Sequence, residues 1–302
     1  MEKSCLTVKN LGKDYGSKNA LTGVTLDVHA GEIMGLVGPN GAGKTTLIKI
    51  AMGLLKPTTG SVSLYDKDIK ATGHDEMRRV GYIPDEPFFY EFMTARQTIE
   101  FNRGFYPGWD SQKCDDMLQR FHLPLDEPVK NMSRGMKAQL GLILVLAQKA
   151  DFLILDEPLE GLDPLRRLEF LNLVLEDFLE CADRSVLISS HYLEELERVV
   201  DRVAFLHEGR LLRLMNIEQL KMEEKTIRVV FQKEPPETLL SMPGIKAVQQ
   251  EGKTSYLLTI EDNFNAIYEA CSRHPHFILE VYHRNLEDMF MDYSGRDNDE
   301  HK

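Results

Sequence analysis

Residues 38–46, GPNGAGKTT, have the composition and spacing of a loop that binds phosphate groups. Glycines let the backbone turn tightly and aim N–H groups at an anion, Lys44 is placed to reach β- and γ-phosphates, and the Thr45 hydroxyl is placed to ligate Mg²⁺. The apolar residues 33–37 predict a strand before the loop, and residues 47–52 predict a helix whose N-terminal end attracts anions. This context disfavours an ordinary glycine-rich turn. We predict a nucleoside triphosphate site that contains Gly38, Asn40, Gly41, Gly43, Lys44, Thr45 and Thr46.

Two adjacent carboxylates, Asp156 and Glu157, follow the apolar residues 152–155. Neighbouring residues of an extended chain point to opposite sides, so the two carboxylates take separate roles. Asp156 is placed to hold Mg²⁺ through its water shell, and Glu157 is placed to polarise an attacking water. An acidic loop after a core strand is the alternative for this pair alone. Together with the phosphate-binding loop, the pair predicts hydrolysis of the triphosphate.

The pattern of strands and helices predicts an α/β fold that would position these residues. Residues 152–155 and 186–188 are short apolar runs typical of parallel strands buried on both faces. Residues 6–37 alternate as short β-strands do, and residues 94–147 are mostly helical. Since ligands bind at the carboxyl ends of strands in such sheets, the polar residues after these runs should form one site.

The pattern changes after Leu214, where the order becomes β-α-β-β-α-β, as in ferredoxin-like domains. A final helix is predicted at about residues 286–293. We therefore expect an ATP-binding domain at 1–214 with a helical subdomain at about 87–150, a small α+β accessory domain at 215–295, and a mobile tail at 296–302.

Composition excludes several classes of protein. The net charge of -12 disfavours nucleic acid as the main partner. The most apolar window, residues 140–147, is too short to span a bilayer, and the N-terminus lacks an apolar signal core, so a cytoplasmic protein is expected. The four cysteines have no metal-binding spacing, and we interpret all four as reduced structural residues.

Further segments occur in an order that resembles the ATP-binding subunits of ABC transporters. Tyr15 stands where that family has an aromatic ring that stacks on adenine. Residues 131–136, NMSRGM, resemble the family's signature segment, residues 158–163, PLEGLD, its dimer-contact loop, and residues 188–191, ISSH, its histidine switch. The resemblance extends from about residue 4 to residue 214. It implies a P-loop ATPase fold with an antiparallel β subdomain and a helical subdomain.

The resemblance also implies ATP and Mg²⁺ as cofactors and a role for each matching residue. Ser133 and Gly135 would close on the γ-phosphate held by the opposite subunit of a head-to-tail dimer, and Asp163 would lie in the same contact. His191 would donate a hydrogen bond to the γ-phosphate. From the residues alone, Tyr15 could instead be a half-buried turn tyrosine and His191 a helix-start residue.

Three segments depart from the family pattern. Asp85 stands where the family usually has glutamine, and it can still ligate Mg²⁺ while adding charge near the phosphates. Arg134 and Met136 replace glycine and glutamine in the signature segment. Leu159 and Glu160 replace small residues in the dimer-contact loop. Lys44, Asp156, Glu157 and His191 are all present, so hydrolysis is still expected, with catalytic residues Lys44, Glu157 and His191 and metal ligands Thr45, Asp85 and Asp156.

Residues 84–87, 106–110 and 133–137 resemble a bacterial exporter-type subgroup that includes drug- and peptide-antibiotic-resistance ATPases and YtrB-like proteins. This resemblance implies a subunit on the inner face of the membrane that drives a separate multi-spanning permease together with a second ATP-binding subunit. A soluble ABC-type ATPase acting on ribosomes or another cytosolic partner is the alternative. A GTPase is disfavoured because the sequence has no Asn-Lys pair, and the segment around Ser133 disfavours a small-molecule kinase.

Overall fold

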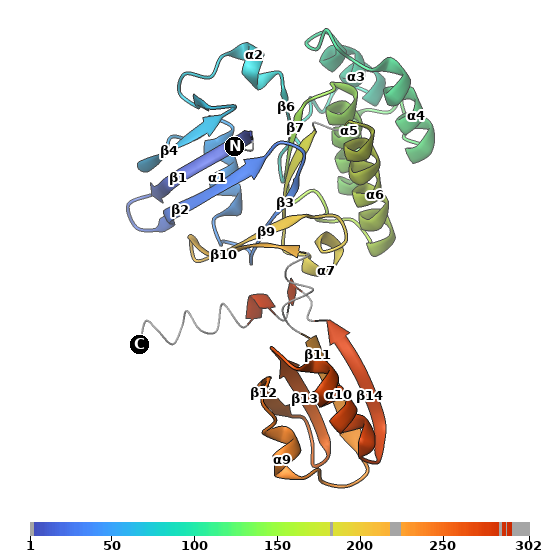
Figure 1. Ribbon diagram of the computed structural model, residues 1–302. Helices are drawn as coiled ribbons and strands as arrows, with labels where there is room; N and C mark the ends of the chain where they lie inside the picture. Colours follow the sequence, from blue (N-terminus) through green and yellow to red (C-terminus); the bar gives the residue numbers. More distant parts are fainter. Residues whose placement is uncertain (1–2, 182–183, 218–224, 284–285, 288, 292–302) are drawn as a thin grey trace. The chain divides into compact units, whose positions relative to one another are not determined.

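The computed structural model describes residues 3–181, 184–217, 225–283, 286–287 and 289–291 (Figure 1). The chain forms two compact units: the first extends to Leu214, and the second begins at Met215. Among the described residues, no helix is long and apolar enough to cross a bilayer.

The first unit is built on a six-stranded sheet with the order β10-β9-β3-β8-β7-β6. Five of its strands, all but β10, are paired in parallel. All residues of β3, β7 and β8 are buried, as expected for parallel strands covered on both faces. The strands are β3 (Ile33–Val37), β6 (Val80–Ile83), β7 (Phe152–Asp156), β8 (Ser185–Ser190), β9 (Arg202–His207) and β10 (Arg210–Asn216).

A smaller antiparallel sheet, with the order β2-β1-β4-β5, covers helix α1 (Lys44–Ala51) on the side away from the six-stranded sheet (Figure 1). Leu47, Ile48 and Ile50 of α1 are buried in one core with residues of both sheets. This packing fixes the start of α1, and with it Lys44, between the two sheets. The strands are β1 (Ser4–Asp14), β2 (Asn19–His29), β4 (Thr59–Leu64) and β5 (Lys67–Asp68).

Helices account for the segment that was predicted to be mostly helical, but as separate elements whose beginnings are capped. The side chains of Thr94, Asp110, Ser133 and Asp163 each accept a hydrogen bond from a backbone N–H in the first turn of a helix, as N-cap residues do. The helices are α2 (His74–Met77), α3 (Ala95–Arg103), α4 (Ser111–Phe121), the 3₁₀ turn η1 (Val129–Asn131), α5 (Arg134–Ala147), α6 (Pro164–Glu180) and α7 (Leu193–Leu196).

The second unit has the predicted β-α-β-β-α-β order and an antiparallel sheet with the order β12-β13-β11-β14, which is the ferredoxin-like arrangement. Alternate residues of β11 and β13 are buried in one core with Ile267 and Cys271 of α10. Its elements are β11 (Lys225–Phe231), α9 (Glu237–Leu240), β12 (Ile245–Gln250), β13 (Ser255–Ile260), α10 (Phe264–Arg273) and β14 (His276–His283). In the predicted final helix, residues 286–287 and 289–291 are helical; its other residues and the predicted tail lie outside the described part of the chain.

The cysteines are all free thiols, as predicted. Cys5, Cys114 and Cys271 are buried, whereas Cys181 is exposed. Interpreting all four as structural residues was therefore wrong for Cys181, which follows the last turn of α6 at the surface.

The phosphate-binding loop between β3 and α1 is enclosed by backbone from two directions. A Cβ at Gly38 would lie 2.0 Å from the carbonyl oxygen of Leu206 in β9, and a Cβ at Gly43 would lie 2.6 Å from that of Ala20 in β2. By contrast, a Cβ at Gly41, where φ is +85°, would meet nothing within 4 Å. Gly38 and Gly43 are thus required by close packing, and Gly41 only by its left-handed conformation.

We predict that Gly38→Ala destabilises the nucleotide-free protein by about 3 kcal/mol, because the added methyl group must displace the β9 backbone. Gly41→Ala should cost only about 1 kcal/mol, the strain of a left-handed alanine. Gly108→Ala, in open space, is the control and should be neutral. Chemical denaturation measures all three; equal losses for Gly38→Ala and Gly41→Ala would contradict the packing explanation.

Candidate nucleotide site

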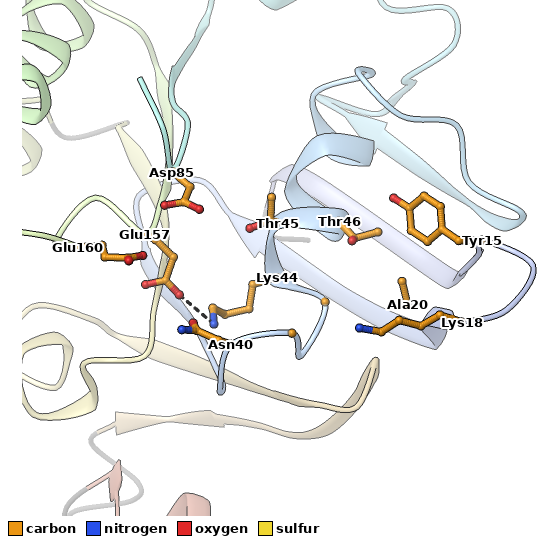
Figure 2. Close-up of a pocket in the computed structure, with 12 residues that line it drawn as sticks. Tyr15, Lys18, Ala20, Asn40, Lys44, Thr45, Thr46, Asp85, Glu157 and Glu160 are labelled. Carbon is orange, nitrogen blue, oxygen red and sulfur yellow. Dashed lines mark ion pairs between the residues drawn. The ribbon is translucent and has the colours of Figure 1, made fainter. Parts of the chain in front are cut away.

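A polar cavity of about 440 Å³ opens beside the phosphate-binding loop (Figure 2). Tyr15 and Lys18, from the turn between β1 and β2, lie at one end of it, and the carboxylates of Asp85, Glu157 and Glu160 lie at the other. The cavity is elongated between an aromatic ring and a phosphate-binding loop, as a nucleotide requires. Its lining residues are Tyr15, Lys18, Ala20, Asn40, Gly41, Gly43, Lys44, Thr45, Thr46, Asp85, Glu157 and Glu160.

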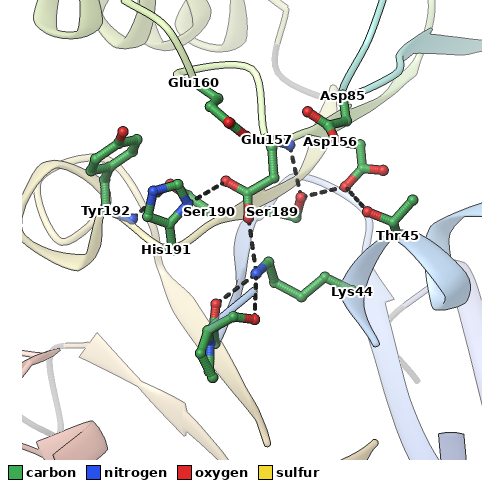
Figure 3. Close-up of polar contacts among 12 residues, drawn as sticks. Lys44, Thr45, Asp85, Asp156, Glu157, Glu160, Ser189, Ser190, His191 and Tyr192 are labelled. Carbon is green, nitrogen blue, oxygen red and sulfur yellow. Dashed lines mark hydrogen bonds and ion pairs between the residues drawn. The ribbon is translucent and has the colours of Figure 1, made fainter. Parts of the chain in front are cut away.

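The Lys44 ammonium is buried and held by three oxygen atoms (Figure 3). Its Nζ donates to the carbonyl oxygens of Gly38, at 2.6 Å, and Pro39, at 3.2 Å. It also forms an ion pair with Oε1 of Glu157 at 2.9 Å, and both side chains are at most 5% exposed. A buried charge needs such partners, and this pair links the phosphate-binding loop to the end of β7.

Asp156 lies at the end of β7, beside the start of α1. Its Oδ1 accepts hydrogen bonds from the hydroxyls of Ser189, at 2.7 Å, and Thr45, at 3.3 Å (Figure 3). Burial raises the pKa of this fully buried carboxyl, and the two hydrogen bonds oppose the shift. Its other oxygen, Oδ2, is buried without a hydrogen-bond partner among the described residues.

Glu157 is directed away from Asp156 by an uncommon backbone conformation. Its φ of 47° is in the left-handed region, which few residues other than glycine adopt, and its N–H donates to the Ser189 hydroxyl at 2.9 Å. Its Oε2 lies 2.9 Å from Nδ1 of His191. The ring centroids of His191 and Tyr192 are 4.0 Å apart. The Tyr192 ring also packs against the Arg167 guanidinium, whose Cζ lies 3.5 Å from the ring centroid. Glu157 therefore bridges Lys44 and His191.

Oxygen donors of the kind that Mg²⁺ prefers are gathered here. The orphaned Oδ2 of Asp156 and the neighbouring Thr45 hydroxyl suit the ion, and Asp85 lines the same cavity. The described residues contain no group of three or more His, Cys, Asp or Glu side chains that could hold a metal ion alone. An ion here would therefore depend on phosphate oxygens and water for its remaining ligands, as Mg²⁺ at nucleotide sites does.

Other predicted site residues lie outside the cavity. Ser133 and Asp163 are exposed and cap α5 and α6, accepting hydrogen bonds from the N–H groups of Met136 and Arg166. A Cβ at Gly135 would lie 3.2 Å from Leu162. Within one chain these residues do not reach the phosphate-binding loop's cavity, as expected if they act on a partner. Tyr15, by contrast, lines it with its side chain 54% exposed.

Sequence reasoning missed Ser189 as a site residue, although it joins both carboxylates. The signal was present, because two serines end the apolar run of β8, next to β7 in the sheet. It also missed three residues that line the cavity, namely Lys18, Ala20 and Glu160. These have no spacing relative to the phosphate-binding loop that would mark them.

The chain is similar in sequence to known ATP-binding proteins. A family model described as "ABC transporter" matches residues 21–160. The ABC transporter ATP-binding protein YtrB of Bacillus subtilis is 31% identical over 227 residues, which are 75% of this chain and 77% of that protein. The bacitracin transport ATP-binding protein BcrA of Bacillus licheniformis is 34% identical over 218 residues, which are 72% of this chain and 71% of that protein.

A solved structure, described as an ATP binding subunit of an ABC transporter, superposes with a TM-score of 0.65 at 30% identity, and the match covers 72% of this chain and 92% of the other. The predicted P-loop ATPase fold and the predicted family are both confirmed by these matches. The chain belongs to the family of ABC transporter ATP-binding subunits.

Proposed function

We propose that this chain binds and hydrolyses ATP and thereby drives a separate membrane permease in a bacterial ABC exporter. Domain 1–214, with its helical subdomain at about 87–150, would bind ATP, and 215–295 would be an accessory domain. The observation that carries the proposal is the convergence of Lys44, Thr45 and Glu157 around one cavity, with the buried Asp156 hydrogen-bonded to Thr45. Export is favoured because BcrA is named for bacitracin transport and the subgroup motifs point the same way.

ATP would lie along the cavity with adenine on Tyr15 and its phosphates on the loop. The ring of Tyr15 is exposed enough to stack on a base, and stacking on an aromatic ring is worth about 1–3 kcal/mol. Asn40, Gly41, Gly43 and Thr46 line the cavity with the loop. The N-terminal end of α1 would add its positive partial charge to the phosphate site.

Thr45, Asp156 and Asp85 would hold Mg²⁺ at the phosphate end. The bound ion supplies positive charge that neutralises the phosphate oxygens. Thr45 and Asp156 are suited to this role because their oxygens already lie 3.3 Å apart. Ser189 would fix the Asp156 carboxylate in that position through its 2.7 Å hydrogen bond.

Hydrolysis would use Glu157 as the group that orients and deprotonates water. Its carboxylate lies in the cavity, and its contact with His191 would keep it directed toward the phosphate end. The Lys44 ammonium would exchange Glu157 for phosphate oxygens when ATP binds, which would release the carboxylate for water. With Nδ1 of His191 on Glu157, its other ring nitrogen, Nε2, would donate to the γ-phosphate.

A second ATP-binding subunit would complete the site from outside. Ser133 and Asp163 are exposed, and the first turn of α5 around Gly135 presents N–H groups that can bind an anion. ATP held between two subunits in a head-to-tail dimer would close them, and hydrolysis would reopen them. The partner subunit would be identical or homologous.

The permease would dock on an exposed aromatic patch of the helical subdomain, which would place the chain on the inner face of the membrane. The patch consists of Phe88, Tyr90, Phe92, Phe101 and Phe105, each at least 44% exposed. Its rings contact one another at centroid distances of 5.1–6.4 Å, and a cavity of about 600 Å³ adjoins it. Clustered exposed aromatics mark protein interaction sites, and a groove of this kind suits an apolar helix face.

Glu157→Gln should lower the ATP hydrolysis rate at least about 100-fold while ATP affinity stays within about threefold, because the amide cannot accept the proton. Lys44→Ala, as the contrast, should lose ATP binding. Phosphate release measures the hydrolysis rate, and calorimetry measures the ATP affinity.

Capture of Glu157→Gln with ATP from native membranes should recover a multi-spanning membrane protein in near-equal amount. Recovery of ribosomal proteins or of soluble proteins alone would support the alternative, a soluble ABC-type ATPase.

Asp156→Asn should stabilise the nucleotide-free protein by about 1 kcal/mol at neutral pH while abolishing the effect of Mg²⁺ on ATP binding. The raised pKa means that folding favours the protonated carboxyl, so the charged form lowers stability above that pKa. The advantage of Asp156→Asn should shrink as the pH falls through the raised pKa toward the ordinary carboxyl value. A variant less stable than wild type at neutral pH would contradict this reasoning. Urea denaturation over a pH series measures it.

Replacing Phe88 and Phe92 together by serine should reduce recovery of the permease with this subunit at least about tenfold and leave ATP hydrolysis by the isolated protein unchanged. Leu179→Ser removes an equally exposed apolar side chain from α6 and is the matched control. Equal recovery with both variants would exclude the patch as the docking site.

A further inference from the structure

Three of the residues that depart from the family pattern, Arg134, Asp85 and Glu160, lie close together in the fold. Arg134 begins α5, Asp85 lies in the loop after β6, and Glu160 lies in the loop after β7. They are 49 and 26 residues from Arg134 in the sequence. One guanidinium joins them: Nη2 lies 3.2 Å from Oδ1 of Asp85, and Nη1 lies 3.2 Å from Oε1 of Glu160.

The position of Arg134 is fixed by packing as well as by charge. Its side chain lies against Gly161, where φ is +75° and a Cβ would be 2.8 Å from Cδ of Arg134. The next residue of α5, Gly135, packs against Leu162 of the same loop. Two neighbouring contacts thus hold the start of α5 on the loop after β7. The arginine is directed at its two carboxylates by its surroundings.

Asp85 and Glu160 line the nucleotide cavity, whereas Arg134 is not among its lining residues. The lining holds three carboxylates, Asp85, Glu157 and Glu160, and two ammonium groups, Lys18 and Lys44. The three carboxylates lie together at the phosphate end (Figure 2). Burial and the nearby Glu160 charge raise the pKa of Asp85, and Arg134 opposes that shift. Without the arginine, a triphosphate would meet two uncompensated negative charges at this end.

We infer that Arg134 is a positioning residue of the nucleotide site, which offsets one of the two negative charges of Asp85 and Glu160 and holds both carboxylates at the cavity wall so that the phosphates can enter. This inference rests on the proposed function. The effect of Arg134 on nucleotide affinity is electrostatic, so it should grow with the charge of the nucleotide and diminish as the salt concentration rises. Because all three side chains are 34–44% exposed, solvent screening keeps the effect moderate.

The test is calorimetric titration of the full chain with ADP and with the β,γ-imido analogue of ATP, in EDTA so that no metal ion recruits Asp85. Arg134→Ala should weaken binding of the ATP analogue by about five- to tenfold and of ADP by about two- to threefold. Adding Glu160→Gln to Arg134→Ala should restore the affinity for the ATP analogue to within about twofold of wild type, since it removes one of the two negative charges that the arginine no longer offsets. Thermal unfolding verifies that each variant is folded.

The control is Arg120→Ala, which removes a similarly exposed arginine, 41% against 44%, paired at 2.7 Å with Glu176 away from the cavity. Arg120→Ala should leave the affinities for ADP and for the ATP analogue within about twofold of wild type. Unchanged affinity in Arg134→Ala, or no recovery in the double variant, would overturn the inference. An arginine that acted only on a partner's phosphate would not be rescued by Glu160→Gln. Failure of the wild type to bind either nucleotide would instead refute the proposed function.

Discussion

The alignment of three parallel strands is the constraint on which the whole candidate site depends. In the six-stranded sheet β3 pairs with β8 and β8 with β7, so Val37 lies opposite Ser190, and Ser189 lies opposite Asp156. These strands are buried on both faces, and polar side chains are tolerated where each strand leaves the sheet. A slip of one residue in β7 would exchange the sides to which Asp156 and Glu157 point. The register of the buried strands thus determines which polar side chains meet at their carboxyl ends.

The local backbone conformation at Glu157 also determines how the two adjacent carboxylates are oriented. Asp156 ends the strand in regular geometry, whereas Glu157 adopts a left-handed conformation that costs about 1–2 kcal/mol for a residue with a Cβ. The Ser189 hydroxyl offsets part of this cost, since it accepts from the Glu157 N–H and donates to the Asp156 carboxylate. One side chain on the neighbouring strand therefore helps to fix two adjacent carboxylates in separate directions, as the proposed metal-binding and water-activating roles require. The buried ion pair with Lys44 then ties that arrangement to the phosphate-binding loop.

Sequence reasoning was accurate where the signal is local. The second unit has the predicted β-α-β-β-α-β order, and the phosphate-binding loop has its predicted strand and helix, because alternation and glycine spacing are properties of short segments. It gave no account of β9 and β10, whose mixed residues lack a clear period, although β9 supplies the carbonyl that excludes any side chain at Gly38. Ser189 was missed although two serines end the apolar run of β8, because its contacts with Asp156 and Glu157 arise only when β8 pairs with β7.

The departures from the family pattern show how far single positions can mislead. Taken one at a time, Asp85 adds a negative charge near the phosphates, Arg134 fills a position usually occupied by glycine, and Glu160 enlarges a loop of small residues. In the folded chain the two added carboxylates lie on the two arms of the one added guanidinium. The changes therefore sum to one net negative charge instead of two, and the arginine is accommodated because Gly161 leaves room for its side chain. A substitution beside a nucleotide site should accordingly be judged by the net charge of its contact cluster, which only the fold reveals, since these residues come from two different loops and the start of a helix.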